Sequence, residues 1–369
     1  MTDKSQPDGE SFSALDPSAD DIRRWGNAAV EVMARYLASI RDQRVYPQTT
    51  SRHIREKLDG ALPDEGVDFE RLLEDFRNIV ETSRHNGHPR MFGYVQAPGT
   101  AVAAIADLLA SSLNANLTAW RSAPAAVEVE RLTIDWIKQI LGYDERAAGL
   151  FMSGGSMANM AALAVARRAK APGDILSKGA RSLPKEMRVY VSKETHHSVT
   201  KAAILLGIGG DNVCCVNVDA RYKIDTGDLV SKIRQDLAAG YLPFCVVANA
   251  GTVVTGAFDP LEQLSEIAQQ FNLWMHVDAC YGGFSALAPS ARPLFKAIRE
   301  ADSVALDPHK WLYLPVDCGC LLYRDPQAAR ATFAHEADYT RVISQEADEA
   351  FAFWDYGPEL SRRFRALKV

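Results

Sequence analysis

The feature of this sequence that most constrains its fold is the alternation, beyond Gly149, of short apolar runs with longer amphipathic stretches. The apolar runs have the length of buried strands, whereas the stretches between them show the apolar spacing of helices. Strand, helix and strand in repetition predict an α/β fold with a mostly parallel sheet flanked by helices. Ligands of such sheets bind beyond the carboxyl ends of the strands, so we expect the functional residues there.

The expected strands cover residues 188–192, 212–218, 242–250, 273–278, 303–306 and 319–323. Helices are expected at residues 100–115, 123–141, 157–170, 198–206, 226–239, 260–271 and 291–299. Two earlier helical patterns, at residues 21–41 and 68–83, are typical of a helical N-terminal arm. The alternative is that the first of these helices packs on its own domain.

Composition and charge argue against several classes of protein. A formal net charge of −6 gives no support for a nucleic-acid-binding surface. No apolar run reaches the roughly 18 residues of a membrane helix, and residues 1–21 lack the basic and apolar regions of a signal peptide. The six cysteines form no Cys-x-x-Cys pair, so we expect reduced core thiols in a cytoplasmic protein, and no metal site.

Lys310 lies in the segment Ala305-Leu-Asp-Pro-His-Lys-Trp311, a few residues after an expected strand ends. Apolar and aromatic residues stand close to it on both sides. Burial disfavours the charged ammonium form, so a lysine in this setting is expected to act as a nucleophile. The alternative is a lysine whose stem packs on Trp311 while its amine reaches water.

The segment Ser153-Gly-Gly-Ser-Met-Ala-Asn159 opens a helix directly after an apolar run. Glycines permit close approach of the backbone, and free N–H groups at a helix start bind anions, with the Ser156 hydroxyl as a further donor. A phosphate is the natural ligand, although the Gly-Lys-Ser/Thr ending of a P-loop is absent. Taken alone, such a segment is more often a plain turn and helix cap.

Two further polar sites follow expected strands. Asp278 ends an apolar strand, where it either caps the next turn or pairs with a cation such as a protonated ring nitrogen. His196 and His197 begin a helix, where a histidine either stacks on a planar ligand or caps the helix. A phosphate site, a partner for a planar cation, an aromatic face and a nucleophilic lysine together indicate pyridoxal 5′-phosphate.

From His88 to the last residue, the sequence resembles the pyridoxal-dependent decarboxylases of the aromatic-L-amino-acid and glutamate decarboxylase group. The matching motifs are HPRMFGY from His88, SGGSMAN from Ser153, THHS from Thr195, HVDAC from His276, DPHKW from Asp307 and ELSRRFRALKV from Glu359. The resemblance implies the fold of PLP-dependent transferases (fold type I) and a homodimer. It also implies a truncation at Val369, inside the last motif, where the family continues into a small C-terminal domain.

The same resemblance implies three parts of the chain. Residues 1–90 are expected to form a tail and a helical dimerisation arm. Residues 91–330 are expected to form the PLP-binding large domain. Residues 331–369 are expected to hold a catalytic loop and the start of the small domain.

Single residues also take expected roles from the resemblance. Lys310 is the expected Schiff-base lysine, and Asp278 the partner of the pyridine nitrogen. His196, rather than His197, is expected to stack on the cofactor ring. Tyr339 or His196 is expected to protonate the substrate carbon after carbon dioxide leaves. The expected cofactor-binding residues are Gly155, Ser156, His196, Asp278, Cys280, His309 and Lys310, and the expected substrate-binding residues are Tyr94 and Val95.

The implied activity is decarboxylation of an L-amino acid to the amine and carbon dioxide, with aromatic amino acids as the first expectation. The alternatives are an aldehyde synthase or carbon–carbon lyase of the same fold, or a non-catalytic PLP-binding homologue. Val95 and Thr118 occupy positions where aromatic-specific members carry other residues, so acidic amino acids stay open. The family motif Gly-Thr-Thr reads Gly-Thr-Val here, so Val253 lacks a hydroxyl, and on a regular strand Thr252 would point to the opposite face.

Overall fold

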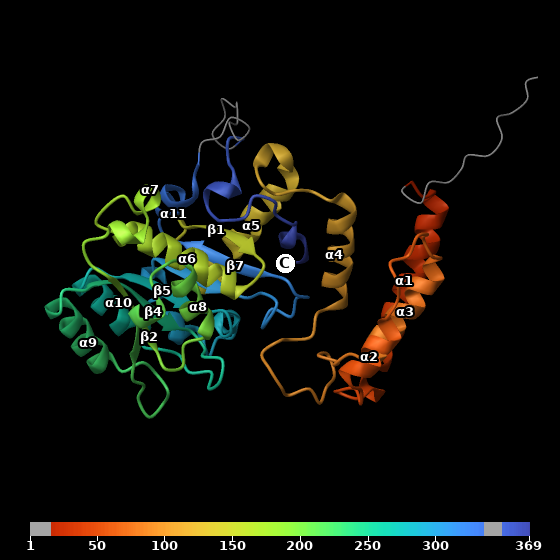
Figure 1. Ribbon diagram of the computed structural model, residues 1–369, viewed down its shortest axis with the longest axis horizontal. Coiled ribbons are helices and arrows are strands. Elements are labelled where there is room, and N and C mark those ends of the chain that lie inside the picture. Colours follow the sequence, from red (N-terminus) through yellow and green to blue (C-terminus); the bar gives the residue numbers. More distant parts are fainter. Residues whose placement is uncertain (1–15, 336–348) are drawn as a thin grey trace, which may run out of the picture. The chain divides into compact units, whose positions relative to one another are not determined.

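The computed structural model describes residues 16–335 and 349–369, which divide into two compact units at Gly93. The first unit contains helices α1 (Ala19–Ser39), α2 (Ser51–Leu58) and α3 (Phe69–Glu81) (Figure 1). The Ser18 hydroxyl accepts the backbone N–H of Asp21 at 3.1 Å and so caps the start of α1. The rings of Trp25 and Phe69, 5.5 Å apart, join α1 to α3.

The second unit holds the sheet and the helices around it (Figure 1). Its strands are β1 (Ala148–Met152), β2 (Met187–Ser192), β3 (Val213–Val216), β4 (Leu242–Asn249), β5 (Trp274–Asp278), β6 (Ser303–Leu306) and β7 (Gly319–Tyr323). Its helices are α4 (Ala101–Leu113), α5 (Pro124–Leu141), α6 (Gly155–Lys170), α7 (Ile175–Lys178), α8 (His197–Leu205), α9 (Thr226–Ala238), α10 (Leu261–Gln270) and α11 (Pro326–Phe333).

The seven described strands form one sheet in the order β1-β7-β6-β5-β4-β2-β3. Neighbouring strands from β6 to β3 are parallel, whereas β7 runs antiparallel to both β1 and β6. Every residue from Pro243 to Asn249 is buried, which requires cover on both faces of the sheet. Helix α6 packs across β4 to β7 and against α8, while α9 and α10 pack on β3 to β5. The predicted mostly parallel α/β sheet is confirmed.

Two sequence-based expectations about elements were wrong. Strand β1 was not expected, although its apolar residues had been noted ahead of the glycine-rich segment. The helix expected at residues 291–299 is replaced by two short 3₁₀ turns, Arg292–Phe295 and Ile298–Glu300. Phe295 and Ile298 are both buried, and a three-residue spacing fits the three-residue repeat of a 3₁₀ turn as well as a helix.

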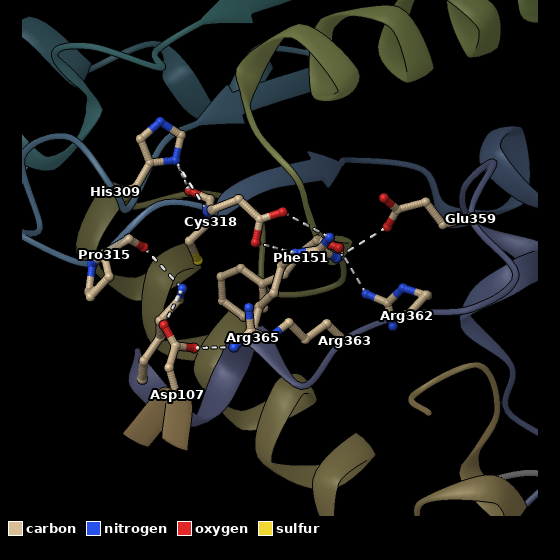
Figure 2. Close-up of polar contacts among 11 residues, drawn as sticks. Asp107, Phe151, His309, Pro315, Cys318, Glu359, Arg362, Arg363 and Arg365 are labelled. Carbon is tan, nitrogen blue, oxygen red and sulfur yellow. Dashed lines mark hydrogen bonds and ion pairs between the residues drawn. The ribbon is translucent and has the colours of Figure 1, made fainter. Parts of the chain in front are cut away.

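The C-terminal segment, residues 359–369, packs against the rest of the second unit through buried basic side chains (Figure 2). Arg362 forms an ion pair with Glu130, and neither side chain is exposed. The same guanidinium donates to the carbonyl oxygens of Leu117 and Phe151, each at 2.9 Å. The segment is therefore attached to both α5 and β1.

Two further cations of this segment hold the loop that follows β6. Arg365 pairs with the Asp317 carboxylate at 3.2 Å. Nζ of Lys368 lies 3.0 Å from both the Asp107 carboxylate and the carbonyl oxygen of Pro315. These contacts tie residues 315–317 to α4 and to the C-terminal segment.

Within the described ranges, no helix combines the length and apolarity that a membrane crossing requires.

Candidate active site

A cavity of about 390 Å³ lies in the second unit, beyond the carboxyl ends of the strands. Strand β4 ends at Asn249 and β5 at Asp278, and these two residues are paired in register. Strand β6 ends one residue before Asp307. Parallel strands place their carboxyl ends at one edge of a sheet, so these polar side chains converge although they are far apart in the sequence. The lining residues include Val95, Ser153–Met157, Asn159, His196, Ser198, Asn249, Gly251–Val253, Asp278, Cys280, Tyr281, Asp307, His309 and Lys310.

Lys310 is paired with a carboxylate inside this cavity. Its Nζ lies 2.9 Å from Oδ2 of Asp307, and its side chain is only 15% exposed. Burial opposes the charged ammonium form, but the negative charges around the amine, among them Asp307, leave the pKa of Lys310 above its ordinary value. The expectation that burial frees the amine was therefore wrong, because Cys280, Asp307 and Asp278 together outweigh the effect of burial.

The start of α6 forms a cradle for an anion. Its N-cap residue is Gly154, and no side chain caps the first turn. A Cβ atom on Gly155 would lie 2.4 Å from Sγ of Cys280 and 2.8 Å from Oδ2 of Asp307, so only glycine fits. The helix start thus directs backbone N–H groups into the cavity with no side chain of Gly155 in the way, which fits a phosphate.

Asp278 is buried and hydrogen-bonded at the end of β5. Its Oδ1 accepts the backbone N–H of Cys280 at 3.1 Å, and its Oδ2 accepts the side-chain amide of Asn159 at 2.9 Å. His196 caps α8 and lines the cavity. Burial lowers the pKa of His196, although the Asp278 carboxylate acts in the opposite direction. The Asp278 carboxylate can accept a further hydrogen bond from a protonated ring nitrogen, and the His196 imidazole faces the same cavity. Both features suit a planar heteroaromatic ligand.

The cavity brings together most of the predicted site residues. Gly155, Ser156, His196, Asp278, Cys280, His309, Lys310 and Val95 all line it. Tyr94 does not line it, and its side chain is 80% exposed at a backbone φ of 65°. Tyr339 lies outside the described residues.

The expectation for Thr252 was wrong. Strand β4 ends at Asn249, and the chain turns at Gly251, whose φ is 95°. Thr252 is consequently buried and lines the cavity, and its hydroxyl accepts the backbone N–H of Ala257 at 3.0 Å. The strand pattern predicted the wrong face because it was extended past the end of the strand.

Sequence reasoning missed several cavity residues. They are Asn159, Ser198, Asn249 and Asp307. Asn159 and Asp307 lie within the motifs SGGSMAN and DPHKW, which were assigned to the site because of other residues. The motifs therefore placed these two residues near the site but did not indicate their roles. Ser198 likewise lies within the THHS motif, whereas Asn249 lies in none of the motifs.

An anion cradle, a lysine, a carboxylate and an imidazole around one cavity define a site for a pyridoxal-type cofactor. The chain matches the model of the pyridoxal-dependent decarboxylase conserved domain over residues 51–369. The chain belongs to this family. The predicted family, enzyme class (carboxy-lyase), cofactor (pyridoxal 5′-phosphate) and fold are thereby confirmed.

Individual relatives differ in the substrate that their names give. The chain is 37% identical over 356 residues to the aromatic-L-amino-acid decarboxylase of Bacillus atrophaeus, covering 96% of this chain and 72% of that protein. It is 38% identical over 317 residues to the cysteine sulfinic acid decarboxylase of Rattus norvegicus, covering 86% of this chain and 64% of that protein. The crystal structure of Oryza sativa TDC with PLP and tryptamine superposes with a TM-score of 0.89 at 28% identity, covering 97% of this chain and 74% of that one.

Proposed function

We propose that this protein decarboxylates an L-amino acid to the corresponding amine and carbon dioxide, with aromatic L-amino acids as its substrates. The observation that carries the proposal is the convergence of Lys310, Asp278, His196 and the start of α6 on one cavity. Bound pyridoxal phosphate supplies an electron sink for the electrons that the departing carboxylate leaves behind.

The roles proposed for the residues follow from their chemistry. The N–H groups at the start of α6 and the Ser156 hydroxyl would bind the phosphate. Lys310 would hold the cofactor covalently, and its amine must first lose the proton that Asp307 stabilises. Asp278 would keep the pyridine nitrogen protonated, and His196 would contact the ring.

The charges of the cavity support an aromatic rather than an acidic substrate. Among the described residues that line the cavity, Lys310 is the only lysine or arginine, and Asp307 already compensates it. A carboxylate in a substrate side chain would therefore need a cation from elsewhere. Tyr281 lines the cavity and packs edge-on against Trp311, with ring centroids 5.0 Å apart, which provides an aromatic wall.

The test is a substrate panel combined with covalent trapping. Purified protein with pyridoxal phosphate should show visible absorption that borohydride reduction converts to a stable modification of Lys310, and Lys310→Ala should show neither. L-Tryptophan, L-tyrosine and L-phenylalanine should yield carbon dioxide and amine, whereas L-glutamate and cysteine sulfinate should not. Amine production by Lys310→Ala would refute the role of the lysine, and turnover of only the acidic substrates would refute the substrate class.

Product analysis separates the proposed activity from its alternatives. A carboxy-lyase yields amine, whereas an aldehyde synthase yields aldehyde from the same substrates. We propose Tyr339 as the proton donor to the substrate carbon, so Tyr339→Phe should shift the product from amine toward aldehyde. An unchanged amine yield in that variant would remove Tyr339 from this role.

We further propose a cytoplasmic homodimer. All six cysteine thiols are free, which agrees with a reducing compartment. Helix α4 exposes apolar side chains that a second subunit would cover, namely Val102, Ile105, Leu108, Leu109 and Leu113. Sedimentation at micromolar concentration should show twice the mass of the chain, and a monomer would contradict the proposal.

A further inference from the structure

Asn159 lies at the branch point of a buried hydrogen-bond network that ends at two residues of the candidate active site. Its side-chain amide donates to Oδ2 of Asp278 and to Oγ of Ser198, each at 2.9 Å. Its Oδ1 lies 2.9 Å from Nε2 of His276. Asn159 and His276 are 1% and 0% exposed, so water does not compete for these hydrogen bonds.

The direction of every hydrogen bond in this network is determined by its two ends. The indole N–H of Trp274 donates to Oγ of Ser303 at 2.9 Å, and this oxygen lies 2.9 Å from Nδ1 of His276. An indole N–H can only donate, and an ionised carboxylate at Asp278 can only accept. Flipping the Asn159 amide would turn its oxygen toward that carboxylate, so the amide nitrogen faces Asp278. His276 therefore donates through Nε2 and accepts the Ser303 hydroxyl through Nδ1.

A second branch reaches His196. Because Oγ of Ser198 accepts from Asn159, its own proton is free to be donated to Nδ1 of His196, 2.9 Å away. The backbone N–H of Ser198 approaches the same ring nitrogen at 3.3 Å. A ring nitrogen that accepts two donors carries no proton, so His196 is neutral with its proton on Nε2. The titratable and charged groups that face His196 are Asp278, Lys310, His197 and Asp307.

We propose that Asn159 is a positioning residue that, through one directed network, holds the Asp278 carboxylate by a hydrogen bond and keeps His196 in its neutral Nε2–H form. The inference rests on the proposed function, because these are the two side chains that would contact the cofactor ring. One amide serves both of them, so its loss should change the hydrogen bonding of Asp278 and the protonation of His196 together. An asparagine with a purely structural role would change stability alone.

The proton positions can be read directly. Histidine-selective ¹⁵N labelling with long-range ¹H–¹⁵N NMR distinguishes the two neutral tautomers from the protonated ring. At neutral pH, with and without pyridoxal phosphate, His196 and His276 should both give the signals of a neutral ring protonated at Nε2. A protonated His196, or an Nδ1–H tautomer at His276, would overturn the proposal.

The variant Asn159→Asp tests the consequence. It is nearly isosteric but replaces the donor toward Asp278 with a second carboxylate. We expect His196 to be protonated at neutral pH and pyridoxal phosphate to dissociate about tenfold faster, the effect of losing a hydrogen bond to a charged group. Unchanged His196 signals with an unchanged dissociation rate would contradict the proposal. Asn212→Asp, at a buried asparagine that does not line the cavity, controls for the burial of an added carboxylate.

A second pair of variants keeps the test independent of the stability of Asn159→Asp. His276→Gln retains a donor toward Oδ1 of Asn159, whereas His276→Phe removes it at similar size. The His196 signals should survive in the glutamine variant and change in the phenylalanine variant, and the same spectrum in both would contradict the proposal. Neither readout needs turnover, so an inactive wild type would refute the proposed function and leave the network tested.

Discussion

Nζ of Lys310 lies 2.9 Å from Oδ2 of Asp307, one turn earlier in the same loop. Burial lowers the pKa of the lysine, but Cys280, Asp307 and Asp278 together leave it above its ordinary value. The nucleophile of the candidate site is thus stored in its protonated form, and the neighbouring carboxylate opposes loss of that proton.

Asp307→Asn should make Lys310 easier to deprotonate. Without the carboxylate the lysine pKa falls, so the pH midpoint for covalent attachment of pyridoxal phosphate should move to lower pH. Attachment rates measured by absorbance across a pH series check this outcome. Asp302→Asn is the matched control, because Asp302 lies just before β6 and pairs with Arg324 instead of Lys310. An unchanged pH midpoint of covalent attachment in Asp307→Asn would show that the ion pair does not set the pKa of the Lys310 amine.

Gly155→Ala should weaken cofactor binding. The added Cβ would lie 2.4 Å from Sγ of Cys280, and overpacking of this kind costs about 1–3 kcal/mol, or about 5- to 150-fold in affinity. Equilibrium binding of pyridoxal phosphate measures the loss. Gly173→Ala, where the Cβ meets nothing within 4 Å, should bind normally. Adding Cys280→Ala to Gly155→Ala should restore part of the affinity, and the absence of any loss in the single variant would contradict the cradle.

Arg362→Met should strongly destabilise the protein. It leaves Glu130 as a charge without its partner in the interior, which costs about 3–5 kcal/mol of the free energy of unfolding. Urea unfolding measures the change. The double variant Arg362→Met with Glu130→Leu should recover much of the loss, because it removes both charges. Arg363→Met breaks a half-exposed pair with Asp107 and should cost about 1 kcal/mol or less. Equal losses in the two single variants would show that burial of the ion pair is unimportant.

Stability should fall as the pH falls from about 6.5 toward 4, in part through His276. Burial lowers the pKa of His276 to about 4 in the folded state. Between pH 6.5 and 4, the unfolded chain therefore binds a proton at this residue that the folded chain does not bind. The contribution is complete above the ordinary histidine pKa of about 6.5, and its loss amounts to on the order of 3 kcal/mol at the acidic end. Unfolding free energies of wild type and His276→Gln across this range should converge on acidification. Replacement of the exposed His53 by Gln should leave the wild-type slope unchanged.

Much of the site could be predicted from the sequence because its signals are local. A glycine-rich segment after an apolar run, an aspartate at a strand end and a lysine in an apolar loop are each visible within a few residues. Strand ends are also local, which is why Asp278, His196 and Lys310 could be assigned to one edge of the sheet. Local patterns failed at residues 291–299, because the spacing of the apolar residues there fits both a helix and 3₁₀ turns. They also failed at Thr252, because the strand ends at Asn249, before that residue.

The sequence by itself therefore determined the mostly parallel α/β architecture, the cofactor class and most of the residues that we propose to hold the cofactor. Only the tertiary structure decided the state of those residues. The ion pair between Asp307 and Lys310 depends on the shape of one loop, and Asn159 meets Asp278 across 119 positions of sequence. The physical reason is that a hydrogen-bond or charge partner is chosen by strand register and helix packing, which no short stretch of sequence records.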